Sequence, residues 1–106
     1  MEINLTTPTQ FKVLSLLIEK AEELEMSLDG YTQVGYNSNS GYIWLWNEDY
    51  MFSLGLTDYG YNRGETEVEL ILSCPETGEE FFSTDKTDLY EQYREYCEAE
   101  GIECYV

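Results

Sequence analysis

The side chains of this sequence that are best suited to chemistry are carboxylates, and the clearest group lies in the segment DLYEQYREYCEAE, residues 88–100. Four acids recur there at spacings of three, four and three residues: Asp88, Glu91, Glu95 and Glu98. On an α-helix these spacings line up on one face. Tyr90, Tyr93 and Cys97 fall on the neighbouring stripe, which we expect to face the core. The acids therefore form either the solvated side of an amphipathic helix or a recognition surface.

Two further groups of acids are concentrated in the same way. One stands near the end of an expected first helix: Glu22, Glu23 and Glu25. The other lies along an expected strand at a spacing of two, and so on one face: Glu65, Glu67 and Glu69. Negative side chains near a helix C-terminus are unfavourable by roughly 0.3–1 kcal/mol each before screening. Because 22 acids face only five bases, this placement favours a use for negative charge that outweighs its cost in stability.

The net charge of −17 limits the class of partner. Solubility of a small domain needs a net charge of only about 2–8 in magnitude. Nucleic-acid-binding proteins carry basic patches and anionic membranes attract basic segments, so we expect neither direct nucleic-acid binding nor membrane binding. A basic protein surface is the partner that this charge favours. The competing explanation is an organism with an acidic proteome, such as a halophile, and the abundance of Tyr, Trp, Leu and Ile argues against it.

Other kinds of chemistry have little support. The chain has no histidine and three cysteines without paired spacing, so we expect no zinc site and reduced thiols without a disulfide. Phosphate-binding loops and the motifs G-x-S-x-G and H-E-x-x-H are absent, and we predict a protein that is not an enzyme and has no cofactor. The segment DYGYNRG, 58–64, weakly resembles a calcium loop, but Arg63 stands where glycine is required. A Mg²⁺ site built from strand carboxylates is left open as an alternative.

The elements that position the acids begin with a helix. Thr7 is a suitable N-cap, Pro8 stands at the first helical position and Gln10 completes a capping-box spacing. The helix is expected to run to about Met26 and to end before Asp29-Gly30. Its core-facing positions recur at three and four residues: Phe11, Leu14, Leu17, Ile18, Ala21 and Leu24.

The middle of the chain changes to strand-like alternation. Strands are expected over residues 31–36, 42–46, 50–56, 66–74 and 79–83, with DYGYNRG as a loop. The short turns imply antiparallel pairing. A second helix follows, capped by Ser83, Thr84 or Asp85 and ended by Gly101. We therefore predict an α+β fold: an N-terminal helix over one face of an antiparallel meander of four to five strands, and a C-terminal helix.

Length and hydropathy complete the expected organisation. The 106 residues, 1–106, correspond to about one domain. The sequence contains no apolar run of about 20 residues, the length that a membrane-spanning helix needs. The segment MEINLTTPTQ has neither a basic nor an apolar signal-peptide region, so we expect a cytoplasmic protein.

Aromatic residues offer a second candidate surface. Residues 42–46 are apolar on both sides, with Ile43 and Leu45 on one face and three aromatic residues on the other: Tyr42, Trp44 and Trp46. One face must either lie under the second helix or form an exposed patch, which would be a protein interface or a homodimer seam. Tyr59 and Tyr61 flank Gly60 in the expected loop and are candidate anchors for such contacts.

In size, charge and small α+β layout the chain resembles the acidic phage and mobile-element inhibitors that mimic nucleic acid, the anti-restriction and anti-CRISPR proteins. The resemblance implies a phage protein that acts without catalysis in the host cytoplasm. Its implied partner is a basic nucleic-acid-binding host protein, a CRISPR effector or a restriction enzyme. Rows of carboxylates about 5–6 Å apart on a rigid helix can occupy a groove built for phosphates. The alternative is a binding or assembly module that uses the aromatic sheet face, with the acids serving solubility.

Overall fold

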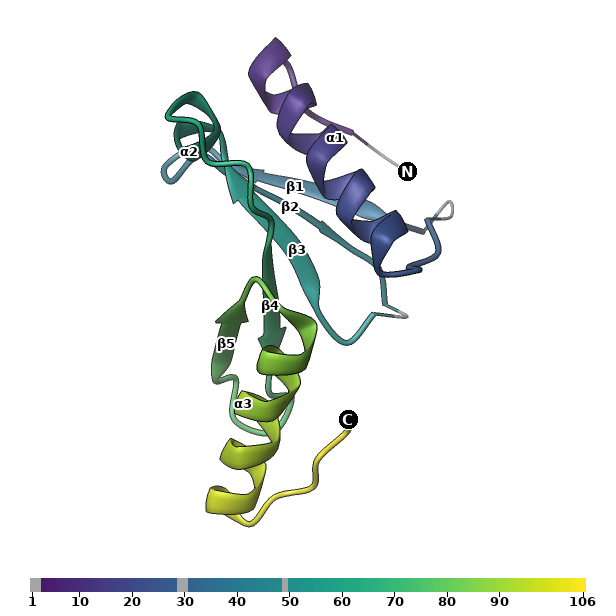
Figure 1. Cartoon of the computed structure of the whole chain (residues 1–106), viewed down its shortest axis with the longest axis vertical. Helices are drawn as coiled ribbons and strands as arrows, with labels where there is room; N and C mark the ends of the chain where they lie inside the picture. The colour runs from purple at the N-terminus through teal and green to yellow at the C-terminus, as the bar shows by residue number, and fades with distance from the viewer. Residues whose placement is uncertain (1–2, 29–30, 49) are drawn as a thin grey trace.

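The computed structural model describes residues 3–28, 31–48 and 50–106. Its helices and strands follow in the order α1 (Pro8–Glu23), β1 (Gln33–Asn37), β2 (Tyr42–Trp46), β3 (Ser53–Thr57), α2 (Asp58–Asn62), β4 (Glu69–Ser73), β5 (Glu80–Ser83) and α3 (Lys86–Glu100). The strands pair antiparallel in one sheet of order β1-β2-β3-β4-β5 (Figure 1). The predicted α+β fold, a helix followed by a meander and a second helix, is confirmed.

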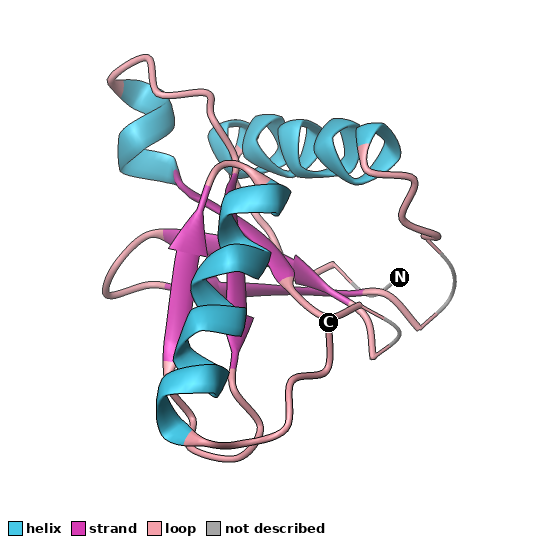
Figure 2. Cartoon of the chain, turned by 60° about the horizontal axis from the view of Figure 1, so that its bottom comes forward, coloured by secondary structure: helices cyan, strands magenta, loops and turns pink. Residues whose placement is uncertain are grey.

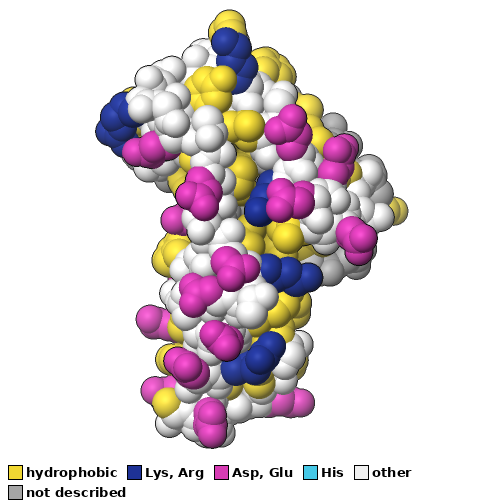
Figure 3. Space-filling model, viewed as in Figure 1, with side chains coloured by type: hydrophobic (Ala, Val, Ile, Leu, Met, Phe, Trp, Pro, Cys, Tyr) yellow, Lys and Arg dark blue, Asp and Glu magenta, His cyan; other side chains and the backbone are white. Residues whose placement is uncertain are grey.

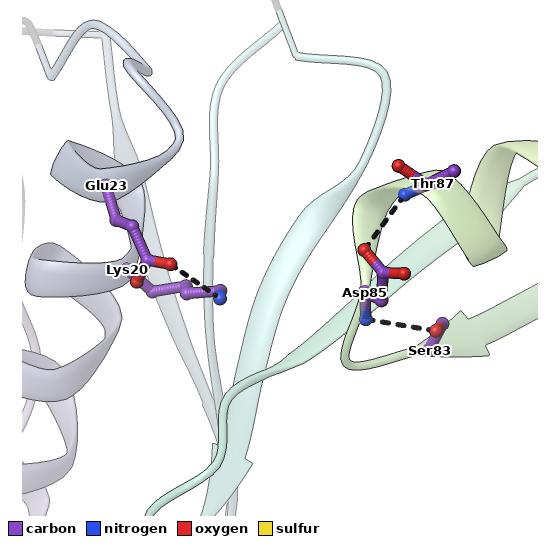
Figure 4. Close-up of polar contacts among 5 residues, drawn as sticks. All are labelled: Lys20, Glu23, Ser83, Asp85 and Thr87. Carbon is purple, nitrogen blue, oxygen red and sulfur yellow. Dashed lines mark hydrogen bonds and ion pairs between the residues drawn. The ribbon is translucent and has the colours of Figure 1, made fainter.

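The predicted helix caps are confirmed at three of the four ends of α1 and α3. The Thr7 hydroxyl accepts a hydrogen bond from the Gln10 backbone N–H at 3.2 Å, and the Gln10 side chain accepts one from the Thr7 N–H at 3.1 Å. The Asp85 carboxylate caps α3 by accepting from the Thr87 N–H at 3.2 Å (Figure 4). Gly101 ends α3 with a φ of 67°, a left-handed conformation that favours glycine.

The fourth end differs from the prediction, because α1 stops at Glu23 instead of about Met26. Glu25 has a φ of 59°, so the chain leaves the helix through a left-handed residue. The Met26 N–H then bonds the Ala21 carbonyl at 2.9 Å and the Glu25 N–H bonds the Glu22 carbonyl at 3.0 Å. This is the Schellman arrangement, with glutamate where glycine is usual. The predicted stop at Asp29-Gly30 lies outside the described residues.

The core-facing stripe of α1 also differs from the prediction near the start of the helix. Phe11 is 46% exposed, whereas Gln10 is buried. The capping box holds the Gln10 side chain against the first turn and places it on the buried stripe with Val13, Leu14 and Leu17. Phe11 is therefore rotated about 100° away from that stripe.

Several strands are shorter than predicted. Residues 50–52, 66–68 and 31–32 lie next to β3, β4 and β1 without belonging to them. The predicted loop 58–64 instead contains the short helix α2. The Thr57 hydroxyl caps α2 by accepting from the Gly60 N–H at 2.9 Å. This cap makes a helical turn favourable despite the glycine in its middle.

Both long helices pack on the same face of the sheet. α1 contacts β2 and β3, and α3 contacts β4 and β5; Figure 2 shows the two helices running in different directions across the sheet. The strand register aligns four buried residues on this face: Val34, Leu45, Leu54 and Leu70. The core lies here, and each such buried aliphatic side chain contributes about 1.5–3 kcal/mol. Among the described residues, no helix covers the other face of the sheet.

Candidate functional site

The acidic row of α3 is exposed along its full length. Asp88, Glu91, Glu95 and Glu98 all face solvent. The helix turns Leu89, Tyr93 and Cys97 into the core, so the predicted core stripe is confirmed for the last two, while Tyr90 is half-buried. Within the described residues the ion pairs are Lys20–Glu23 and Arg63–Glu65, and neither involves the row. Its carboxylates are therefore available to cations from outside the chain.

The row belongs to the most acidic part of the chain. The part of the chain that forms β4, β5, α3 and the C-terminal tail, residues 69–106, has eleven acids against two bases, Lys86 and Arg94. Acidic side chains run down the α3 surface in the lower half of Figure 3. The Tyr105 hydroxyl donates to Glu76 at 3.1 Å and ties the tail to the β4–β5 turn. We call residues 69–106 the acidic half.

The predicted row of Glu65, Glu67 and Glu69 is not formed on one strand face, because β4 begins only at Glu69. Glu65 belongs to the end of α2: its N–H bonds the Gly60 carbonyl at 2.8 Å and its carboxylate lies 3.6 Å from Arg63. Glu67 is exposed in the connection. Glu69 lies on the face of the sheet that no helix of the described residues covers, which we call the open face. Its carboxylate accepts a hydrogen bond from the Tyr42 hydroxyl at 3.2 Å.

The acids at the end of α1 stand apart from the α3 row. Glu22 and Glu23 are exposed, and Glu23 pairs with Lys20 at 3.4 Å (Figure 4). Glu25 borders a cavity of about 320 Å³ that also includes Lys86 and Tyr90 from the start of α3. The end of α1 and the start of α3 thus share one groove, in which the Lys86 ammonium lies 5.6 Å from the centre of the Tyr90 ring.

The two predicted tyrosine anchors lie on α2, at the opposite end of the molecule from the C-terminal end of α3 (Figure 1). Tyr59 is 54% exposed, whereas Tyr61 is half-buried against the core. Tyr59 packs close to Gly41, where an added Cβ would collide with its ring. These tyrosines are not brought together with the acidic row.

The aromatic face of β2 is the patch that the helices leave open. Its three aromatic side chains are half-buried and stacked, with ring centroids 6.2 Å apart for Tyr42 and Trp44 and 5.7 Å apart for Trp44 and Trp46. α1 covers the other face of β2, and no helix of the described residues covers this one, so the aromatic side chains form an open, half-buried patch and do not lie under the second helix. A Cβ on Gly35 would collide with the Trp44 indole, and one on Gly55 would collide with the Tyr42 phenol. The signal in the sequence was a glycine inside each neighbouring strand.

Glu69 is oriented by this patch. Burial, reinforced by the nearby Glu69 carboxylate, raises the pKa of Tyr42 far above its usual value. The phenol therefore stays protonated and donates to Glu69 at 3.2 Å. The carboxylate is held beside the aromatic side chains, on the open face.

The described residues give little support for a metal site or for a reactive thiol. Across residues 3–28, 31–48 and 50–106 no group of three or more His, Cys, Asp or Glu side chains is placed to hold a metal ion. Asp58, the first residue of the calcium-loop-like segment, accepts a hydrogen bond from the Tyr36 hydroxyl at 3.2 Å. Cys74, Cys97 and Cys104 are free thiols.

Comparison with known proteins adds no assignment. No protein-family model, curated protein or solved structure matches this chain. None of the helices in the described part of the chain is both long and apolar enough to cross a membrane.

Proposed function

We propose that this protein is a non-catalytic inhibitor whose acidic half occupies the nucleic-acid-binding surface of a basic host protein, a CRISPR effector or a restriction enzyme. The observation that carries the proposal is the α3 row: its four carboxylates are exposed and make no ion pair within the described residues. The row belongs to residues 69–106, which have eleven acids in all and two bases.

The geometry of the row supports mimicry of a phosphate backbone. Asp88 and Glu98 are ten residues apart, which is about 15 Å along a helix axis at about 1.5 Å per residue. The four carboxylates are thus spaced by about 5 Å, of the same order as the roughly 3.4 Å per phosphate along one strand of duplex DNA. The row is held on a rigid element, because Leu89 and Tyr93 of the same helix are fully buried. Docking it on a lysine- and arginine-rich groove would release counterions from both surfaces.

The test is competition with DNA. Labelled duplex is bound to purified CRISPR effectors or restriction enzymes, and its displacement by this chain is followed by fluorescence anisotropy. The test variant is Glu91→Gln/Glu95→Gln/Glu98→Gln, and the matched control is Glu19→Gln/Glu22→Gln/Glu23→Gln, which removes the same charge from exposed positions of α1. Exposed ion pairs contribute about 0.2–1 kcal/mol each, so the α3 variant should lose roughly 3- to 150-fold in potency.

The control variant shows whether potency depends on the α3 row itself or only on the total negative charge of the chain. It should change the potency by no more than about twofold, because it leaves the acidic half intact. Equal losses in both variants would mean that only total charge matters. A wild-type chain that displaces no duplex from any of these enzymes would end the proposal.

A second candidate function is a binding or assembly module that uses the open aromatic face. It is favoured by a specific observation, the stacked side chains of Tyr42, Trp44 and Trp46 on a face that no helix covers in the described residues. In that case the acids serve solubility, and binding would survive high salt and be lost on replacement of Trp44.

A further inference from the structure

The open face has the features of a pre-formed binding surface. Trp44 lies across Gly35 of β1 and Tyr42 lies across Gly55 of β3, at sites where any Cβ would displace the rings. The planes of neighbouring rings differ by only 27° and 23°. Beside the two indoles is a cavity of about 400 Å³, which extends to Ile71 and Ser73 of β4. The two glycines fix the aromatic side chains as a floor instead of letting them project freely.

Carboxylates border this floor on the same face. The register places Trp44 opposite Gly55, and Gly55 opposite Glu69, so the indole and the carboxylate point to the same side of the sheet. The Tyr42 hydroxyl fixes Glu69 there through a 3.2 Å hydrogen bond. Glu48 lies at the rim of the cavity. Aromatic faces and carboxylates are thus presented together.

Charge decides which occupant fits. All five basic residues lie elsewhere, two on α1, one at the end of α2 and two on α3: Lys12, Lys20, Arg63, Lys86 and Arg94. A second copy placed face to face would therefore bring acids against acids, in a pair of chains that carry −17 each. Nucleic acid is repelled for the same reason. A cationic group that also stacks is the complementary ligand.

We propose that the open face binds an arginine-bearing polypeptide segment, whose guanidinium groups stack on the aromatic floor of Tyr42, Trp44 and Trp46 and pair with the carboxylates that border it, Glu69 among them. Arginine is planar, stacks on aromatic faces and presents several N–H donors to a carboxylate. This inference deepens the second candidate function by naming the chemistry of its partner. It does not depend on the α3 row, which lies on a helix that covers the other face of the sheet.

Tryptophan fluorescence provides a direct assay, because the chain has two tryptophans and both lie on this face. The full chain is titrated with the blocked pentapeptide acetyl-Gly-Arg-Gly-Arg-Gly-amide and with its citrulline analogue, and the indole N–H signals are followed by NMR. We expect the arginine peptide to shift both readouts. The citrulline peptide keeps the shape and loses the charge, and it should bind at least about tenfold more weakly, a difference of about 1.4 kcal/mol.

Three variants locate the site. Glu69→Gln preserves the shape of the side chain and should weaken arginine-peptide binding by up to about fivefold, the range for losing an exposed ion pair. Trp44→Leu should abolish the response, with circular dichroism checking its fold. Glu19→Gln/Glu22→Gln/Glu23→Gln removes three charges from exposed positions of α1 and should leave binding of the peptide unchanged.

Several outcomes would overturn the inference. Equal binding of the citrulline peptide would show that charge plays no part, and an equal loss in the α1 variant would show that the peptide binds net charge only. Indole shifts with cellopentaose but not with the arginine peptide would make the floor a carbohydrate platform. Sedimentation showing a dimer that Trp44→Leu dissociates would make it a homodimer seam. None of these results affects the DNA-competition test, so the two proposals fail separately.

Discussion

Replacing Glu25 by glycine is expected to stabilise the fold while leaving its contacts intact. Glu25 has a φ of 59°, and a left-handed conformation is unfavourable for a residue with a Cβ by about 1–2 kcal/mol. Its carboxylate also stands just beyond the end of α1, where the helix dipole disfavours negative charge by roughly 0.3–1 kcal/mol before screening. The larger freedom of glycine in the unfolded chain offsets about 0.5–1 kcal/mol of this gain. The net stabilisation should be about 1 kcal/mol.

Thermal and urea unfolding measure this effect. A gain of about 1 kcal/mol should raise Tm by about 4–8 °C in a domain of this size. Glu25→Gln removes the charge but keeps the strained backbone, and it should recover only the smaller electrostatic part. Glu25→Ala serves as the control for loss of the side chain. If glycine is no more stabilising than alanine, residue 25 does not have the left-handed conformation, and the account of how α1 ends is wrong.

The same variants test whether acidic charge is used at the expense of stability. Glu25 is a partner-binding candidate from the sequence that lies outside the acidic half, and it borders the groove between α1 and α3. If it contributes to binding, Glu25→Gly should unfold at a higher temperature and yet compete less well with duplex DNA. A variant that is more stable and equally potent would remove the end of α1 from the proposed binding surface.

Four further predictions concern the caps, the aromatic floor, pH and salt. Gly101→Ala should destabilise the fold by about 1 kcal/mol in urea unfolding, because a left-handed alanine is strained while no atom within 4 Å obstructs its Cβ. Gly55→Ala should displace the Tyr42 ring and lower the unfolding free energy by about 1–3 kcal/mol, with a change in tryptophan emission. The pKa of the Tyr42 hydroxyl is raised in the fold, so the unfolded chain loses this proton first as the pH rises. The contribution of Tyr42 to stability should therefore be complete below about pH 10 and fall above it. Urea unfolding at about pH 9 and about pH 11 should show this fall, and the fall should be smaller in Tyr42→Phe. Raising NaCl to about 1 M, where the Debye length is about 3 Å, should raise Tm by screening self-repulsion, and the Glu91→Gln/Glu95→Gln/Glu98→Gln variant should show a smaller rise.

The sequence alone determined the features that depend on neighbours along the chain. The start of α1 was predictable because Thr7, Pro8 and Gln10 meet within one turn, and the limits of α3 because Asp85 and Gly101 act on adjacent backbone groups. The meander followed from alternation between short turns. The acidic face of α3 followed from helical periodicity, because its other stripe contains the residues that are buried.

Local patterns misled where a competing contact was overlooked. The end of α1 was placed too late, because nothing in its composition marks Glu25 as the residue that turns left-handed. Glu65, Glu67 and Glu69 alternate like a strand, but a strand also needs a partner, and pairing with β3 reaches only as far as Glu69. The helix α2 was read as a loop, although the Thr57 cap was present in the sequence.

Only the tertiary structure decided which surfaces are left open. Residues 42–46 are apolar on both faces, so their alternation could not say which face the helices would cover. That choice depends on where α1 and α3 pack, and both pack on the side of Leu45, Leu54 and Leu70. It leaves the side chain of Trp44 on the other face of the sheet, which also carries Glu69. Net charge is a property of composition, but the position of that charge is set by contacts between residues far apart in the chain.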